Sequence, residues 1–292
     1  MGRMMIVGAR GFIGSSLSIK AQDMGWDVVR ISSSDGSGLD PRSGEIPDGF
    51  NIPTGVSTVI YMAQSPYFRE VPEHIDHLMM VNTYSAIKLA NLSRKAGASR
   101  FLYLSTGNVY EPSFEASNEA SRLNFVNWYA LSKIHAEQSL RLLGSAEMRV
   151  IIARLFGVYG PNQTGRLVPN LIQTISEGSP VVLQAKEKGE KDPKGLRICL
   201  SYLDDIVSAL MELCVFDASV TLNIASSEVV SIKEIALAIG NIIKRDPFFE
   251  VSTTCRATDL VADSSLFSSK FGTRFRPFSK GIEDTINIGS RS

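Results

Sequence analysis

The chain has 292 residues, of which 44% are hydrophobic and 21% charged, and its 30 basic side chains balance its 30 acidic ones. A zero formal charge gives no overall field that would attract nucleic acid or an anionic membrane, and no apolar run is long enough to span a bilayer. The cysteines are odd in number and widely spaced, at Cys199, Cys214 and Cys255. They are expected to be reduced core residues, which is typical of a cytoplasmic protein. The histidines and carboxylates do not cluster in a pattern that predicts a metal site.

Three glycines interrupt the start of the chain. Residues 4–7 form a short apolar run that predicts a buried strand, and Gly8, Gly11 and Gly14 follow at intervals of three. Apolar and small residues then return at helical spacing over residues 15–24. A strand, a glycine turn and a helix present free backbone N–H groups to a pyrophosphate. We therefore predict a dinucleotide site here, the alternative being a glycine-rich turn without a ligand.

Strand-like runs and helical patterns alternate through the first half of the chain. This alternation is the signature of a parallel sheet covered by helices. The runs expected to form strands are residues 27–31, 57–63 and 100–104, and the expected helices span about 73–96 and 129–143. The ends of such strands are where an open parallel sheet places its chemistry.

The residue that follows the second predicted strand bears on the choice of cofactor. In many dinucleotide folds an acidic residue there binds the ribose 2′-hydroxyl of the adenosine. Here the position is Ser32, which carries no charge to repel a 2′-phosphate. Arg10, in the glycine turn, is placed to reach the same ribose, with Arg30 or Ser33 assisting. This pattern favours NADP, with NAD as the alternative, unless Arg10 simply faces solvent.

Tyr129 and Lys133 lie four residues apart at the start of a predicted helix, so they share one helical face. A nearby ammonium lowers the pKa of a phenol, which makes tyrosine a usable acid or base near neutral pH. The spacing is common by chance. Here, however, the pair follows both the glycine turn and a strand that ends at Ser105 and Thr106, so we treat it as a candidate catalytic pair.

With these motifs in this order, the chain resembles the extended short-chain dehydrogenases/reductases, which include nucleotide-sugar epimerases, dehydratases and reductases. The resemblance covers essentially the whole chain. It implies a Rossmann-type α/β fold with a doubly wound parallel sheet and a smaller C-terminal substrate-binding domain. The implied dinucleotide-binding domain is residues 1–160 with a returning segment near 204–222, and the substrate-binding region is residues 161–292. The resemblance also implies a homodimer that pairs through the helices containing Asn82 and Tyr129.

The resemblance assigns roles to matching positions. The implied catalytic residues are Thr106, Tyr129 and Lys133. The implied cofactor-binding residues are Gly8, Arg10, Gly11, Phe12, Ile13, Gly14, Ser32, Ser33, Ala63, Asn82, Tyr129, Lys133 and Phe156. The implied substrate-binding residues are Gln64, Thr106, Arg197, Arg256 and Asp259. The two arginines would bind the diphosphate of a nucleotide-sugar, and Asp259 would lie near its ribose.

Three positions depart from the family pattern. Gly107 and Asn108 stand where family dehydratases carry an Asp–Glu pair, and neither can act as an acid or base, so sugar dehydration is disfavoured. Gly157 replaces an asparagine that contacts substrate phosphate in many relatives, which leaves the sugar unspecified.

We therefore expect NADPH-dependent reduction of a keto-sugar nucleotide. An NAD-dependent nucleotide-sugar 4-epimerase could use the same residues and is the first alternative. A non-catalytic dinucleotide-binding regulatory protein is the alternative from another class, although such proteins usually lack the tyrosine or the lysine. The charged run at residues 185–194 is expected to form a mobile loop beside the substrate site.

Overall fold

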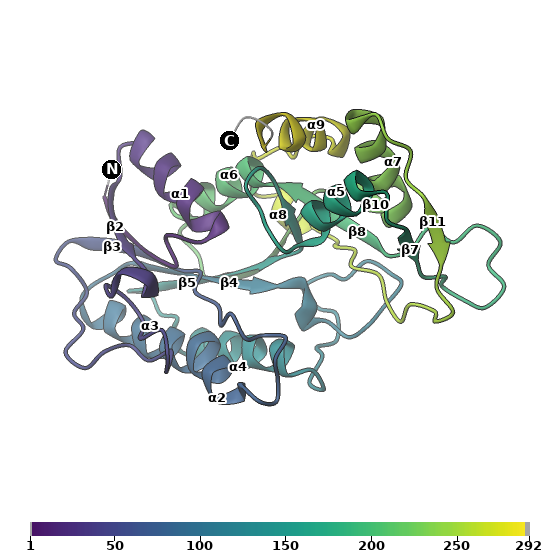
Figure 1. The fold of residues 1–292 in the computed structure, drawn as a ribbon. Coiled ribbons are helices and arrows are strands. Elements are labelled where there is room, and N and C mark those ends of the chain that lie inside the picture. The colour runs from purple at the N-terminus through teal and green to yellow at the C-terminus, as the bar shows by residue number, and fades with distance from the viewer. Residues whose placement is uncertain (1, 290–292) are drawn as a thin grey trace. The chain divides into compact units, whose positions relative to one another are not determined.

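A computed structural model describes residues 2–289 (Figure 1). The chain divides into two compact units. The first comprises Met1–Glu111, Ser121–Leu155 and Val207–Asn223, and the second comprises Pro112–Ala120, Phe156–Ile206 and Ile224–Ser292. Within the described residues, no helix combines the length and the apolar character that crossing a membrane requires.

The first unit is built on a 6-stranded sheet in the order β2-β1-β3-β4-β5-β9. Its strands are β1 (Arg3–Val7), β2 (Asp27–Ile31), β3 (Val56–Tyr61), β4 (Arg100–Thr106), β5 (Arg149–Leu155) and β9 (Val220–Ile224). The first five pair in parallel. Strands covered on both faces read as continuous apolar runs, and Met4 to Val7 of β1 are accordingly at most 1% exposed. The predicted strands and their parallel arrangement are confirmed.

Helices cover both faces of this sheet (Figure 1). Helix α1 (Phe12–Asp23) lies on one face, and α2 (Ile75–Met79), α3 (Ser85–Lys95) and α4 (Trp128–Leu143) lie on the other. Leu89 and Ala90 of α3 and Leu140 of α4 pack with Tyr61 and Tyr103 of the sheet in one buried cluster. These apolar positions recur at helical spacing, which is why the residues around them form helices on the sheet.

The single helix predicted over residues 73–96 is wrong in one respect. A π-helical segment, η2 (Met80–Tyr84), separates α2 from α3. Buried tyrosines of the sheet bind its backbone: the Tyr61 hydroxyl donates to the Val81 carbonyl at 2.6 Å, and the Tyr103 hydroxyl donates to the Asn82 carbonyl at 2.7 Å. Burial raises the pKa of Tyr103 well above its ordinary value, so this hydroxyl remains a donor. Contacts from distant strands therefore stabilise the π turn, and helical periodicity carries no sign of them.

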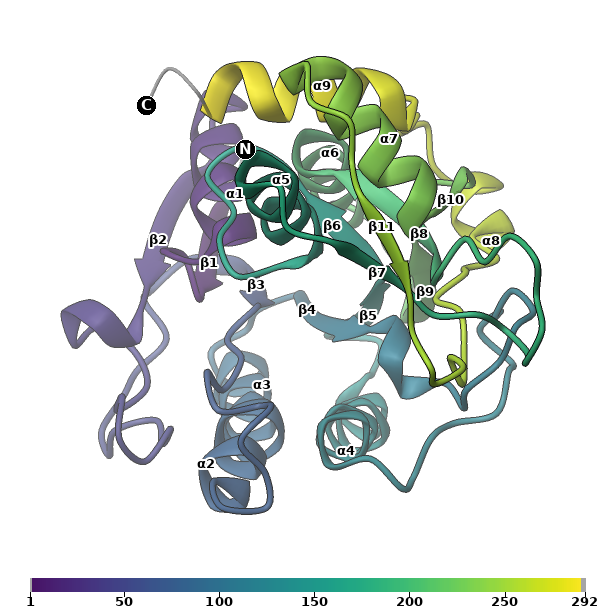
Figure 2. The same ribbon diagram turned by 45° about the vertical axis from the view of Figure 1, so that its right-hand side comes forward.

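The second unit contains a 3-stranded sheet in the order β10-β8-β6 and a 2-stranded pair, β11-β7. The strands are β6 (Gly157–Tyr159), β7 (Val181–Leu183), β8 (Arg197–Tyr202), β10 (Val229–Ser231) and β11 (Phe249–Val251). Its helices include α5 (Leu167–Glu177), α7 (Ile232–Ile243), α8 (Ser265–Ser268) and α9 (Phe278–Gly289), and α6 (Leu203–Leu213) runs from this unit into the first. Helix α7 packs against both α5 and α9 (Figure 2). The loop predicted at residues 185–194 contains no helix or strand.

The glycine turn between β1 and α1 is tight. Gly8 has a φ of 88°, which glycine adopts without strain, and the Gly11 N–H donates to the Gly8 carbonyl at 3.0 Å. A methyl group on Gly14 would overlap the Gly8 carbonyl oxygen and lie 3.0 Å from the Cα of Ala9. The helix therefore approaches the strand closely only because position 14 has no side chain.

Gly14→Ala should lower the free energy of unfolding by about 1–3 kcal/mol, the usual effect of overpacking. In the absence of a clash, alanine in a helix would instead raise the free energy of unfolding by up to about 1 kcal/mol. The sign of the change therefore shows whether a side chain at position 14 clashes. Urea unfolding followed by circular dichroism measures it. Ser15→Ala, at an exposed neighbouring position, is the matched control, and a stabilised Gly14→Ala protein would contradict the close approach.

Candidate functional site

The carboxyl ends of the central strands lie together at one edge of the sheet. In the strand register, Val7 pairs with Tyr61, Tyr61 with Tyr103, and Thr106 with Leu155. The chain leaves this edge at the glycine turn and at the loop containing Ala63 and Gln64. The edge therefore gathers predicted cofactor and catalytic positions from three separate parts of the sequence.

The start of α1 fits the pyrophosphate of a dinucleotide. Gly11 is the N-cap residue, and no side chain caps this end of the helix. The backbone N–H groups of the first helical turn, including those of Phe12 and Ile13, have no acceptor within the helix. A side chain at Gly14 would fill the turn, as described above. These residues can hold a dinucleotide phosphate, with the positive end of the helix dipole toward it.

The structure adds an acidic residue, absent from the sequence-based prediction, beside the predicted ribose-binding position. Ser32 is buried, and its hydroxyl accepts the Ser34 N–H at 3.3 Å, which caps the short turn η1 (Ser33–Asp35). This turn brings Asp35 to Arg10, with 3.1 Å between Oδ2 and Nε. Hydrogen bonds from Ser37, with a smaller contribution from Arg10, lower the pKa of Asp35. A carboxylate therefore accompanies Arg10 at this end of the sheet.

The sequence pattern does not indicate Asp35 as a ribose-binding candidate, because it lies several residues beyond the end of β2. Only the capped turn returns it to the glycine loop. Arg30, which was expected to assist at the ribose, instead donates from Nη2 to the Gln22 side chain at 2.8 Å. The Arg10 side chain remains 64% exposed.

Tyr129 and Lys133 stand one turn apart near the start of α4. The helix begins after Asn127, whose side chain accepts the Ala130 N–H at 3.0 Å. The Tyr129 hydroxyl donates to Gln64 Oε1 at 3.1 Å, which joins α4 to the loop after β3. The Lys133 ammonium donates to the Leu104 carbonyl at 3.0 Å. Both members of the pair are therefore hydrogen-bonded to residues near the carboxyl ends of the central strands.

Thr106 ends β4 with its hydroxyl near the following turn. Its Oγ1 accepts the Asn108 N–H at 3.2 Å and so caps η3 (Gly107–Val109). A hydroxyl that accepts from the backbone still has its own proton to donate. Thr106 can thus present a hydrogen-bond donor to a reacting oxygen.

Lys133 is an unusual lysine because it is buried. It is 3% exposed, and its ammonium lies 4.8 Å from the centroid of the Tyr103 ring. Burial lowers the pKa of Lys133 to about 7, although the carboxylate of Glu137 acts in the opposite direction. Its charge state in the protein without cofactor therefore changes near neutral pH.

Asn82 connects the parts of the site from behind. It is fully buried, its Oδ1 accepts the Ser65 N–H at 3.2 Å, and its Nδ2 donates to Ser132 Oγ at 3.0 Å. The side chain thereby ties the loop containing Ala63 and Gln64 to helix α4. In the described residues, no group of three or more His, Cys, Asp or Glu side chains is arranged to hold a metal ion.

A buried ionic network behind Thr106 was missed by sequence reasoning. Glu137 accepts hydrogen bonds from Ser105 Oγ at 2.5 Å and from Arg154 Nη2 at 2.5 Å. Arg154 Nη1 donates to the Tyr110 hydroxyl at 2.8 Å, and that hydroxyl donates to Asn223 Oδ1 at 2.6 Å. Glu137 lies one turn beyond Lys133 on α4. This position on the helix is the only feature of the sequence that indicates a role for Glu137 near the predicted catalytic pair.

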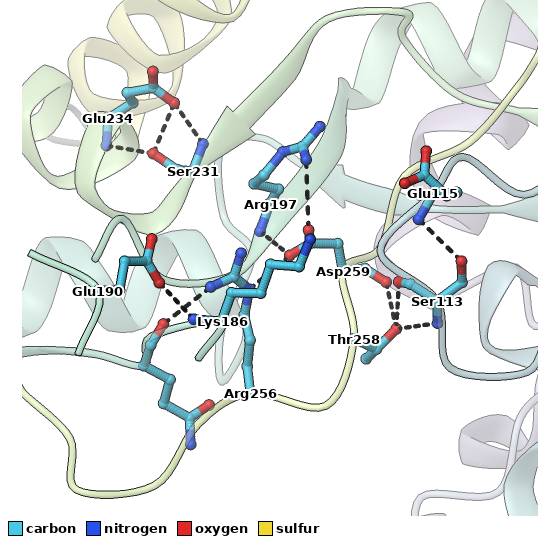
Figure 3. A network of polar contacts seen from close by, with 11 residues as sticks. Ser113, Glu115, Lys186, Glu190, Arg197, Ser231, Glu234, Arg256, Thr258 and Asp259 are labelled. Atoms are coloured by element: carbon cyan, nitrogen blue, oxygen red, sulfur yellow. Dashed lines mark hydrogen bonds and ion pairs between the residues drawn. The ribbon is translucent and has the colours of Figure 1, made fainter. Parts of the chain in front are cut away.

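The predicted substrate residues of the second unit form one cluster (Figure 3). Asp259 accepts hydrogen bonds from Arg256 Nε and from the Arg197 backbone N–H, each at 2.9 Å. Its side chain is 1% exposed, whereas that of Arg197 is 49% exposed. Asp259 therefore lies beneath the two arginines and fixes the segments that carry them.

Gly157, where the resemblance implied an asparagine, has no room for a side chain. A Cβ here would lie 2.6 Å from Leu200 Cδ2 and 2.9 Å from the Cys199 carbonyl oxygen of the adjacent β8. Strand β6 therefore packs closely on β8 at a position without a side chain. Phe156, the predicted cofactor contact next to it, is buried.

Comparisons with known proteins bear on the family and the fold of the chain. A model of the NAD dependent epimerase/dehydratase family matches residues 4–211. One curated relative, the 3beta-hydroxysteroid dehydrogenase/Delta(5)-Delta(4) isomerase 1 of Caenorhabditis elegans, is 30% identical over 112 residues, which are 37% of this chain and 24% of that protein. The chain thus matches about a quarter of the length of this relative.

Two solved structures share the fold over almost their whole length. MoeE5, in complex with UDP-glucuronic acid and NAD, superposes with a TM-score of 0.82 at 23% identity, covering 99% of both chains. RMD from Pseudomonas aeruginosa, complexed with NADPH, gives a TM-score of 0.80 at 18% identity and covers 100% of both chains. The match of the family model over most of the chain shows that this protein belongs to the NAD-dependent epimerase/dehydratase family.

Proposed function

We propose that this protein transfers a hydride between a bound nicotinamide dinucleotide and a nucleotide-sugar. The proposal rests on the hydrogen bonds that join the predicted catalytic pair to residues near the carboxyl ends of the central strands. Tyr129 contacts Gln64 after β3, and Lys133 contacts Leu104 near the end of β4. Family membership and the uncapped N-terminus of α1 support the dinucleotide.

In this proposal each side chain has one task. Thr106 donates a hydrogen bond to the reacting oxygen, and Tyr129 gives or takes its proton. Lys133 binds the nicotinamide ribose and, when charged, favours the tyrosinate. The nicotinamide supplies or receives the hydride. Hydrogen bonds preorganised around the developing alkoxide are the largest expected contribution to the rate.

The substrate class follows from the cluster of the second unit. Arg197 and Arg256 are held by one buried carboxylate, and paired guanidinium groups suit the geometry of a diphosphate. We assign them to the diphosphate of the nucleotide-sugar. Gly107 and Asn108 supply no acid or base next to Thr106, so the proposed chemistry is hydride transfer without dehydration.

Two forms of this chemistry differ in their cofactor. NADPH-dependent reduction of a keto-sugar nucleotide is the first, and it rests on the uncharged Ser32 and the exposed Arg10. The ion pair between Arg10 and Asp35 favours the second form, an NAD-dependent 4-epimerase. A carboxylate at this position would repel a 2′-phosphate and could accept a hydrogen bond from a free 2′-hydroxyl.

Replacement of Tyr129 by phenylalanine should reduce turnover of a nucleotide-sugar about 10²- to 10⁴-fold, the range of general acid–base catalysis. Affinity for the dinucleotide, measured by fluorescence titration, should stay nearly unchanged because the ring remains. Tyr84→Phe, at a tyrosine that is 57% exposed, is the matched control. Retained turnover in Tyr129→Phe would exclude the acid–base assignment.

Paired substitutions separate the two cofactors. If the protein uses NADPH, Arg10→Ala should weaken NADPH binding about tenfold and NADH binding much less, because a charge-assisted bond to the 2′-phosphate is lost. Asp35→Asn should then strengthen NADPH binding. If Asp35 instead binds the ribose of NAD, Asp35→Asn should weaken NADH binding. Equal losses for both dinucleotides in Arg10→Ala would contradict the proposed contact with the 2′-phosphate.

Lys133 should make stability depend on pH in a definite direction. An unfolded lysine has a pKa of about 10.4, whereas burial holds that of folded Lys133 at about 7. As pH falls between these values the unfolded chain binds the proton first, so Lys133 destabilises the fold increasingly down to about pH 7. The stability of Lys133→Met relative to wild type should therefore rise from pH 10 to pH 6.

Thermal unfolding of the cofactor-free protein at pH 6, 8 and 10 measures this difference. The hydrogen bond lost to the Leu104 carbonyl lowers stability equally at each pH and does not affect the trend. Lys95→Met, at an exposed lysine of α3, is the control and should show no trend. A flat difference for Lys133→Met would contradict the lowered pKa.

A further inference from the structure

One aromatic ring of the second unit carries two cations. The Lys186 ammonium lies 4.7 Å and the Arg256 Cζ lies 5.5 Å from the centroid of Phe114. Phe114 follows β4 and η3, Lys186 lies in the loop after β7, and Arg256 follows β11. Three segments that are distant in sequence thus meet at one side chain.

The segment that carries Phe114 is anchored beside the segment that carries Arg256. The Ser113 N–H donates to Thr258 Oγ1 at 2.9 Å, and the Asp259 N–H donates to the Ser113 carbonyl at 2.8 Å (Figure 3). Both bonds are made by Thr258 and Asp259, which lie two and three residues after Arg256. The ring therefore has a fixed position relative to the arginine.

An aromatic ring attracts a cation without neutralising its charge. This distinction matters for Lys186, whose ammonium forms no ion pair with any described carboxylate. The carboxylate of Glu190 accepts the Lys186 backbone N–H at 2.6 Å and so fixes the loop. Glu234 accepts hydrogen bonds from Ser231 at the start of α7. The charge of Lys186 is therefore available to a ligand.

Arg197 forms a long ion pair and its side chain stays about half exposed. Asp259 binds Arg256 through Oδ1, but its Oδ2 has no hydrogen-bond donor, and Arg197 Nη1 lies 3.8 Å from that oxygen. Asp259 thus engages Arg256 closely, and Arg197 forms a longer ion pair with it. Lys186, Arg197, Arg256 and Asp259 of this cluster are labelled in Figure 3.

We propose that Lys186 is a third cation that binds the substrate diphosphate, and that Phe114 is the positioning residue that holds Lys186 and Arg256 for it. The inference rests on the proposed nucleotide-sugar function and adds two residues to its binding site. A diphosphate diester carries two negative charges, and the cluster offers three cations against the single buried carboxylate of Asp259. The loop after β7 then acts in substrate recognition through the first lysine of its charged run.

Calorimetric titration of UDP into the full-length protein saturated with dinucleotide tests the proposal. Lys186→Gln should weaken UDP binding about tenfold and flatten its dependence on salt, because one charged contact with phosphate is lost. Lys188→Gln removes the same charge from the same loop and should change the affinity less than twofold. Phe114→Leu should weaken binding about fivefold, and Phe114→Tyr, which keeps the ring, should retain it.

Each outcome has a distinct meaning. Unchanged UDP binding in Lys186→Gln, or equal losses in Lys186→Gln and Lys188→Gln, would overturn the inference while leaving the proposed function intact. Equal losses in Phe114→Leu and Phe114→Tyr would remove the positioning role of the ring. If the wild-type protein binds none of UDP, dTDP and GDP, the nucleotide-sugar proposal itself fails and this inference falls with it.

Discussion

The arrangement of the proposed catalytic residues depends on the buried ion pair between Glu137 and Arg154. The two side chains are 0% and 1% exposed, so water cannot replace either partner. Removing one partner of such a pair typically destabilises a protein by about 3–5 kcal/mol, because the remaining charge is left buried and unpaired. Glu137 also binds Ser105, which precedes Thr106, and lies one helical turn beyond Lys133. One carboxylate therefore links the end of β4, helix α4 and strand β5.

The partners of the cations divide them by function. Arg154 is satisfied by Glu137 and the Tyr110 hydroxyl, which suits a residue that holds structure together. Lys133 has a carbonyl oxygen and a ring, and Lys186 has a ring, so neither charge is neutralised by an ion pair at that contact. Arg10 lies between these cases because Asp35 compensates it while leaving it exposed. In the proposed function, the choice between NAD and NADP depends on this last pair.

The order of the glycine turn, the strands and the predicted site residues along the chain follows from the sequence alone. Glycine spacing located the turn before α1, apolar runs located β1 to β4, and Tyr129 and Lys133 fell at the start of α4 as expected. These features are local, because backbone freedom and side-chain periodicity act within a few residues. The parallel sheet could be predicted for the same reason, and Arg197, Arg256 and Asp259 lie in one cluster.

Contacts between side chains that are distant in the sequence depend on the tertiary structure. Asp35 reaches Arg10 through a capped turn, Tyr61 and Tyr103 bind the π segment inside a predicted helix, and Phe114 receives cations from two distant segments. Each of these contacts joins residues whose spacing in the chain follows no period. Hydrogen bonds and cation–π contacts depend on distances that the packing of strands and loops sets. A linear pattern records the residue types that can make such contacts but not their partners.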